Sequence, residues 1–393
     1  MAVLAFVMFA SYAGVLQVLL PNQLTTLDAS HKVADLSIIA TVSLLFTLVT
    51  QPIIGTFSDR TRSRLGRRGP WIILGGATGG VIVAFTGALT SVVWVGVFII
   101  VGQICLNAMQ GPFTAIVPDR YPRERRGVAS AMFGIGTSAG LTIGVIVAAN
   151  LAAQIGIAYA IFGGTILVVA LVFVLVNRDY SSAASRTDRL TWRAFVGGFW
   201  VSPRRYPDFA WAFAARFCFI LGYFLVLFFQ LFILTDYIHL SVADANKTIG
   251  LLAVITLVTT IVSVVVGGVW SDRAGRRKVF VYVASGFIAV GLVIPLLLPS
   301  VGGMMLMSAI AGIGFGLYTA CDTALMTEVL PKDGATAGKD LGILNIATNL
   351  PQALSSAVGG ILIATLGYSA LFVGGIIAVV VAAFVISRVK SVR

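Results

Sequence analysis

Long apolar runs, separated by short polar connections, recur along the whole chain. A helix needs about 20 apolar residues to cross about 30 Å of hydrocarbon, and most of these runs reach that length. No window has the pattern of a soluble domain. The runs predict membrane-spanning helices at approximately 2–20, 36–57, 70–90, 92–117, 127–150, 156–176, 208–235, 247–270, 279–298, 303–329, 339–365 and 368–388.

One connection is much longer and more polar than the others. It runs from residue 177 to residue 207 and contains six arginines. We interpret it as a cytoplasmic linker between an N-terminal six-helix bundle (1–176) and a C-terminal six-helix bundle (208–393). The expected fold class is therefore an all-α integral membrane protein of twelve transmembrane helices in two bundles.

The two predicted bundles repeat short polar landmarks at a constant distance. Gly55, Ser58, Asp59 and Arg60 reappear 213 residues later as Gly268, Ser271, Asp272 and Arg273. Six spans per repeat is an even number, so both copies keep the same orientation across the membrane. Parallel repeats of this kind predict a substrate site near mid-membrane between the halves.

Composition and charge narrow the class further. Of 393 residues, 58% are hydrophobic and only 11% are charged, and the mean hydropathy is +0.99. Soluble domains carry about 25% charged residues. The net charge of +12 would suit nucleic acid, but 24 of the 27 basic residues lie in clusters between spans, all on one side if the spans alternate. Because basic loops stay in the cytoplasm, we expect a multi-pass protein of the cell membrane and no nucleic-acid partner. The segments expected on the cytoplasmic side are residues 58–69, 118–126, 177–207, 271–278 and 330–338 and the C-terminus.

The cysteines and the N-terminal residues do not change this expected class. Cys105, Cys218 and Cys321 all fall inside apolar runs, so no disulfide framework is expected. Met1 leads straight into the first run without a basic segment, and no cleavable signal peptide is expected.

The repeated landmark is part of a recognisable loop. Residues 268–277 fit the pattern G-x-x-x-D-R-x-G-R-R, and residues 55–68 hold a longer version. This loop resembles the signature of the major facilitator superfamily. A carboxylate at a helix C-terminus is unfavourable unless cations neutralise it, so contacts that form in only one conformer would act as a latch. The alternative is that these arginines are solvated charges that set topology. The residues proposed for the latch are Asp59, Arg60, Arg67, Arg68, Asp272, Arg273, Arg276 and Arg277.

The first-half loop (58–71) is more specific, and resembles the glycoside–pentoside–hexuronide symporters and the related sucrose transporters. Residues 107–112 and 342–352 resemble the sucrose-transporter branch. The resemblance implies a sugar substrate. The positions that match acidic cation ligands of these symporters hold Thr47, Gln51 and Gln110, and so a sodium site of the family type is not expected.

Two sets of amide residues have helical spacing, at i, i+4 and i+7. One lies on the fourth span and the other on the eleventh. This spacing puts each set on one helix face, and amides donate and accept hydrogen bonds without charge, which suits a neutral sugar. The alternative is hydrogen bonding between helices. The residues expected to bind substrate are Gln103, Asn107, Gln110, Asn345, Asn349 and Gln352, together with Gln51 and the aromatic Tyr318.

Two ionisable residues lie deep within predicted spans. Asp322 is about two turns inside the tenth span, and Arg216 is at a similar depth in the seventh. Charged groups in hydrocarbon are costly and mark a pathway or a paired charge. Our hypothesis is that Asp322 carries a coupling proton and pairs with Arg216 in one conformer. The alternatives are a permanent structural pair, or an Arg216 side chain that reaches to the interface.

The function expected from these features is secondary active transport of a sugar or glycoside by alternating access, coupled to protons. A proton-driven multidrug or metabolite exporter of the same fold is the first alternative, and a sensor without transport activity is the second. An enzyme is not expected, because the two histidines lie near the outer surface and no acids cluster within the membrane. No phosphate-binding loop, cofactor or metal site is expected, and the partners are a small solute, protons and the bilayer, with the protein a monomer.

Overall fold

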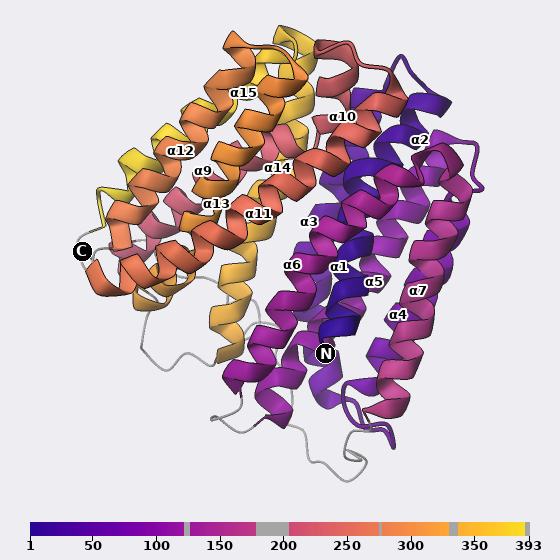
Figure 1. Ribbon diagram of the computed structural model, residues 1–393. Helices are drawn as coiled ribbons and strands as arrows, with labels where there is room; N and C mark the ends of the chain where they lie inside the picture. The colour runs from indigo at the N-terminus through magenta and orange to yellow at the C-terminus, as the bar shows by residue number, and fades with distance from the viewer. Residues whose placement is uncertain (122–125, 178–203, 275–276, 330–336, 390–393) are drawn as a thin grey trace. The chain divides into compact units, whose positions relative to one another are not determined.

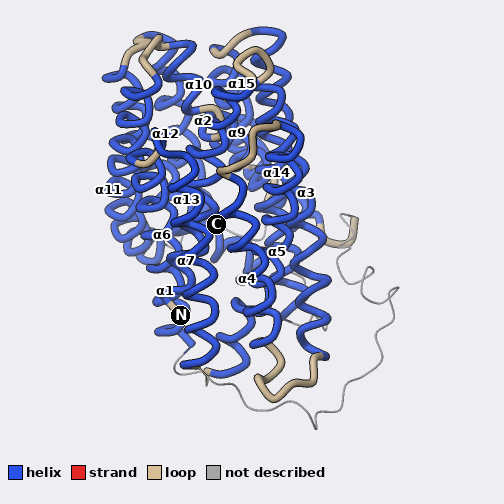
Figure 2. The backbone as a smooth tube through the Cα atoms, turned by 90° about the vertical axis from the view of Figure 1, so that its right-hand side faces the viewer, coloured by secondary structure: helices blue, strands red, loops and turns tan. Residues whose placement is uncertain are grey.

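Every described part of the chain that has regular structure is helical (Figures 1 and 2). The computed structural model describes residues 1–121, 126–177, 204–274, 277–329 and 337–389. Among these residues, 12 helical segments are long and apolar enough to cross a membrane, with mean hydropathies from 1.3 to 2.8. The predicted all-α class with twelve membrane-spanning helices is confirmed.

The chain divides into two compact units, and the first comprises Met1–Arg189. Its first span is built of three pieces, α1 (Ala2–Gly14), a π-helical turn η1 (Val15–Leu19) and α2 (Leu20–Leu27). The other spans are α3 (Lys32–Arg60), α4 (Gly69–Thr86), α5 (Val92–Arg120), α6 (Arg126–Asn150) and α7 (Ile155–Val176), the last preceded by a short 3₁₀ turn, η3 (Ala152–Gln154).

The second unit comprises Leu190–Arg393. Its first span is again interrupted, and consists of α9 (Pro207–Leu227), α10 (Gln230–Phe232) and a π-helical turn η4 (Ile233–Tyr237). The spans that follow are α11 (Val242–Ala274), α12 (Arg277–Leu297), α13 (Val301–Val329), α14 (Ala337–Leu366) and α15 (Ser369–Ile386). Most of the expected linker, residues 178–203, lies outside the described residues.

The two units repeat one pattern of helix packing. Helix α1 packs on α6 as α9 packs on α14, and α4 packs on α7 as α12 packs on α15. Likewise α4 packs on α5 as α12 packs on α13, and α3 packs on α5 as α11 packs on α13. The spacing of 213 residues between the sequence landmarks therefore corresponds to a structural repeat, in which the second unit has the same helix packing as the first.

Close packing of α1 on α6 depends on a row of glycines. A methyl group at Gly136, Gly140 or Gly144 would overlap the backbone oxygen of Ala2, Phe6 or Ala10 respectively. Small residues at intervals of four let two membrane helices approach closely. Gly134 is not part of this row, because a methyl group there would meet nothing within 4 Å.

The first span of each unit departs from the prediction. The first span extends to Leu27 rather than to residue 20, with Pro21 inside it. Proline removes a backbone donor and would leave the Gln17 carbonyl without its i+4 partner, but the chain is already in a π-turn there, where Leu20 N–H bonds to Val15 O. In the seventh span the helix breaks at Phe228 and Phe229 and continues through η4, in which the Ile238 N–H donates to Ile233 O at 3.0 Å.

Candidate functional site

An arginine and an aspartate from different helices form an ion pair within the second unit. Nη1 of Arg216 on α9 lies 2.6 Å from Oδ2 of Asp322 on α13. The side chains are only 13% and 9% exposed. Charges buried this far are stable in a protein when they are paired and hydrogen bonded.

Two further side chains complete this cluster. Nη2 of Arg216 donates to Oγ1 of Thr348 on α14 at 2.6 Å. The Tyr318 hydroxyl donates to Oδ1 of Asp322 at 2.7 Å. Nε of Arg216 is buried and has no hydrogen-bond partner among the described residues. We call Arg216, Asp322, Tyr318 and Thr348 the charged cluster.

Aromatic rings cover one side of the charged cluster. The ring of Tyr318 stacks on that of Phe219, with centroids 3.6 Å apart and planes 12° apart. About one turn away Tyr223 stacks on Phe315 at 4.4 Å. Tyr318, which the sequence suggests as a substrate contact, is buried, and Phe219 covers one face of its ring. Its hydroxyl orients Asp322.

In the first unit, an amide network joins α3 to α5. Asn107 is 2% exposed, and its Nδ2 donates to Thr47 Oγ1 at 2.9 Å and to Gln103 O at 2.7 Å. Its Oδ1 accepts from Nε2 of Gln51 at 2.8 Å. Both the nitrogen and the oxygen of the Asn107 amide are thus hydrogen bonded to other protein groups.

Two members of the same set of amides have other surroundings. Oε1 of Gln110 accepts a hydrogen bond of 3.1 Å from the Tyr12 hydroxyl, which links α5 to α1. Gln103 lines a small hollow between α1, α4 and α5, beside Ser11 and Tyr12, and its side chain bonds to no described residue. The expected set of three is therefore divided between helix linkage (Asn107, Gln110) and a free amide (Gln103).

The amides of the eleventh span are less engaged. Asn349 and Gln352 on α14 are half-buried, and no side-chain hydrogen bond joins either of them to another described residue. The side chain of Asn345 lies outside the described part of the structure. Thr348, the neighbour of Asn349, contacts Arg216, although threonine is too common in membrane helices for the sequence to have singled it out.

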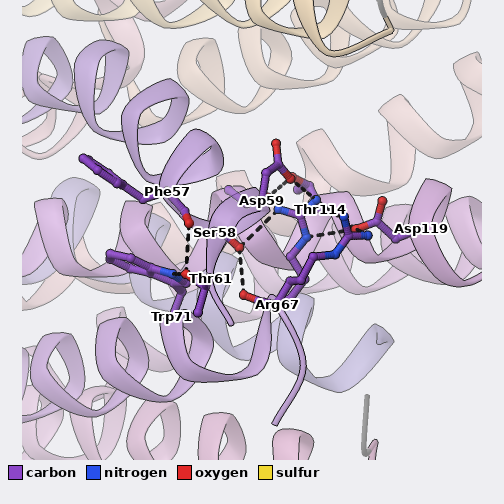
Figure 3. A network of polar contacts seen from close by, with 10 residues as sticks. Phe57, Ser58, Asp59, Thr61, Arg67, Trp71, Thr114 and Asp119 are labelled. Atoms are coloured by element: carbon purple, nitrogen blue, oxygen red, sulfur yellow. Dashed lines mark hydrogen bonds and ion pairs between the residues drawn. The ribbon is translucent and has the colours of Figure 1, made fainter. Parts of the chain in front are cut away.

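A second charged network lies at the end of α3 in the first unit. Its members Ser58, Asp59 and Asp119 are labelled in Figure 3. Nη2 of Arg68 lies 2.5 Å from Asp59 Oδ1 and 2.8 Å from Asp119 Oδ2, and Nε of Arg68 donates to the same Asp119 oxygen at 2.9 Å. Nη1 donates to Ser58 Oγ at 3.1 Å. The Arg68 side chain is only 7% exposed.

This network neutralises two unfavourably placed carboxylates. Asp59 and Asp119 lie in the last turns of α3 and α5, where each meets the negative end of a helix dipole. Arg67 adds a longer contact, with Nη2 3.5 Å from Asp119. Arg60 ends α3 and makes no ion pair within the described part of the chain. Asp119 was not singled out from the sequence, because its contact with Arg68, 51 residues away, is known only from the fold.

The matching loop of the second unit is only partly described. Arg273 lies in the last turn of α11 and is exposed. The side chains of Asp272, Arg276 and Arg277 lie outside the described part of the structure. Within the residues that are described, no group of three His, Cys, Asp or Glu side chains is placed to hold a metal ion.

Known structures share this fold over nearly all of both chains. A point mutant of the nucleoside transporter NupG superposes with a TM-score of 0.76 at 12% identity, covering 99% of this chain and 98% of that one. A D-xylose-proton symporter gives 0.75 at 14% identity, covering 99% and 97%. At these identities the likeness shows the fold alone.

A more similar sequence covers less of the chain. A probable 4-methylmuconolactone transporter of Cupriavidus pinatubonensis (strain JMP 134 / LMG 1197) is 30% identical over 147 residues. Those residues are 36% of this chain and 34% of that protein, and so the match spans about a third of the relative's length.

The family model of the Major Facilitator Superfamily matches residues 1–248 and 231–392. Together the two matches cover almost the whole chain, and the fold of twelve helical spans agrees with them. This protein therefore belongs to the Major Facilitator Superfamily and is an integral membrane protein.

Proposed function

We propose that this protein is a secondary transporter that couples the movement of a small, oxygen-rich solute to protons by alternating access. The observation that carries the proposal is the charged cluster. Asp322 is a carboxylate buried among helices and held by Arg216 at 2.6 Å and Tyr318 at 2.7 Å. Ionisable residues within membrane bundles are costly, and proton relays are one of their main uses.

The solute that we put first is a sugar or glycoside. Gln103, Asn349 and Gln352 have amides that bond to no other described side chain, and amides suit hydroxyl groups, which both donate and accept. The loop at 58–71 and the segments at 107–112 and 342–352 resemble sugar transporters. The glycoside–pentoside–hexuronide and sucrose-transporter branch is part of this proposal.

A lactone is the second candidate solute. It is favoured by one observation, the relative described as a probable 4-methylmuconolactone transporter. Export of apolar drugs is less well supported, because the buried groups of the charged cluster are ionic and hydrogen bonded. We further propose that the protein acts as a monomer in the cell membrane, with its basic loops cytoplasmic.

Transport in proteoliposomes tests the proposal. Counterflow with a panel of radiolabelled sugars and lactones identifies the solute, and an imposed pH gradient then tests coupling. We expect Asp322→Asn to retain counterflow and to lose accumulation driven by the pH gradient. Asp244→Asn is the matched control, because Asp244 pairs with Lys247 on an exposed surface and is expected to leave both activities unchanged. Undiminished proton-driven accumulation in Asp322→Asn would remove Asp322 from the mechanism.

A further inference from the structure

The charge balance of the charged cluster restricts the solute. When Asp322 is ionised, the pair of Arg216 and Asp322 has no net charge. When Asp322 takes up a proton, the guanidinium of Arg216 stays positive, since arginine is not deprotonated in proteins. A neutral solute would then leave one uncompensated cation among membrane helices, which is the costly arrangement that buried pairs avoid.

We infer that the solute carries one carboxylate, and that this carboxylate binds Arg216 when Asp322 is protonated. The inference rests on the proposed proton coupling and names the charge class of the solute. A monoanion restores neutrality, so the site has no net charge both when it is empty and when it is loaded with one proton and one solute. Acidic sugars and other hydroxylated monocarboxylates belong to this class.

The geometry of Arg216 fits a carboxylate ligand. Guanidinium has five N–H donors in a planar fork that matches carboxylate. Asp322 uses Nη1 through a single oxygen, Thr348 uses Nη2, and the buried Nε has no partner among the described residues. Arg216 therefore keeps donors for a second ligand, and protonation of Asp322 weakens its hold on Nη1.

Few groups compete with such a ligand. Among the described residues, the charged or titratable side chains that contact Asp322 are Arg216 from α9 and Tyr318 from α13. Helix α14 contributes the neutral Thr348, which contacts Arg216. The Tyr318 hydroxyl donates a hydrogen bond to Oδ1, so it orients the carboxylate without adding charge. No second acidic side chain pairs with Arg216 within the described part of the chain.

Binding of a simple anion to the purified protein tests the inference without knowledge of the natural solute. Asp322→Asn imitates the protonated carboxyl and should leave Arg216 able to take a monoanion. At about 50 mM, sodium formate is expected to raise the melting temperature of Asp322→Asn by about 3 °C or more, with saturation. Formamide at the same concentration, which has a similar shape and no charge, is expected to have no effect.

A double variant controls for general salt effects. In Arg216→Gln/Asp322→Asn both charges are replaced by amides, and formate is expected to shift the melting temperature no more than formamide does. Equal formate shifts in the single and double variants would overturn the inference. If Asp322→Asn does not fold without a ligand, Asp322→Ala replaces it, because the smaller side chain leaves space for formate. Recovery of monodisperse Asp322→Ala protein with formate but not with formamide would then support the inference. No recovery with formate would contradict it.

Transport separates this inference from the proposed function. One proton and one monoanion together carry no net charge. Uptake is therefore expected to be driven by a pH gradient and to be unaffected by a membrane potential set with potassium and valinomycin at constant pH. A proton-coupled carrier of a neutral sugar would pass the counterflow test, respond to the potential and leave formate without effect. That outcome would preserve the proposed function and contradict the inference.

Discussion

The hydroxyl of Tyr318 donates to Oδ1 of Asp322 from one turn away on the same helix, while Nη1 of Arg216 contacts Oδ2 from another helix. Both oxygens of the carboxylate are therefore occupied by protein donors. Under the proposed mechanism, solute would bind Arg216 and the proton would bind Asp322.

The pair of Arg216 and Asp322 should be more costly to break than to remove. Arg216→Gln leaves a buried carboxylate unpaired and is expected to lower stability by about 3–5 kcal/mol, whereas Arg216→Gln/Asp322→Asn, which buries no charge, should recover most of that loss. Thermal unfolding of the purified variants measures the difference. Equal losses in the single and double variants would show that the charges do not depend on each other.

The amides of the fourth span should divide into structural and substrate-binding residues. Asn107→Leu leaves Gln51 and Thr47 without their partner, and we expect a loss of about 1–3 kcal/mol in unfolding free energy. Gln103→Leu breaks no side-chain hydrogen bond within the described structure, so stability should change by less than about 0.5 kcal/mol while the KM for solute uptake rises. An unchanged KM in Gln103→Leu would exclude Gln103 from the substrate site.

Arg68 should not tolerate replacement by lysine. A lysine has one charged nitrogen, and it cannot reproduce the contacts that the Arg68 guanidinium makes with three residues, Asp59, Asp119 and Ser58. We expect Arg68→Lys to lower the unfolding free energy by about 2 kcal/mol, because the arginine is buried although Asp59 is half-exposed. Arg64→Lys, at an exposed position of the same loop, is the control and should melt like the parent protein.

The row of glycines on α6 can be tested by one pair of variants. Gly140→Leu forces a side chain against the backbone of Phe6 and should destabilise the first unit by about 3 kcal/mol, or prevent folding. Gly134→Leu adds the same side chain where nothing lies within 4 Å and should change stability by less than about 0.5 kcal/mol. Because leucine favours a helix more than glycine does, comparable losses in both variants could not come from helix propensity and would show that the contact with α1 does not determine the effect.

The sequence predicted the spans well because apolar length is a local property. Residues 92–117 were expected in a helix, and α5 begins at Val92 and ends at Arg120. The pairing of Arg216 with Asp322 was also foreseeable, since two buried charges of opposite sign at similar depth gain from meeting. That Asp322 carries a coupling proton stays a prediction.

Other features depended on contacts that no local pattern encodes. Thr348 lies 132 residues from Arg216, and Asp119 lies 51 residues from Arg68. The regular spacing of Gln103, Asn107 and Gln110 predicted that they share one face of α5. Several helices pack on α5, however, so these three residues have different neighbours. Gly134 and Gly136 could not be told apart, because both lie in an apolar run whose facing helix is known only from the fold.

The π-turn at Val15–Leu19, between α1 and α2, gives the first span a position at which the chain can lose one residue. A π-turn holds one residue more than an α-turn. Deletion of a single residue there would restore ordinary helical winding and keep both flanking segments in register with their neighbours. Deletion of a residue elsewhere in the same helix would rotate everything beyond it by about 100° and turn buried faces outward.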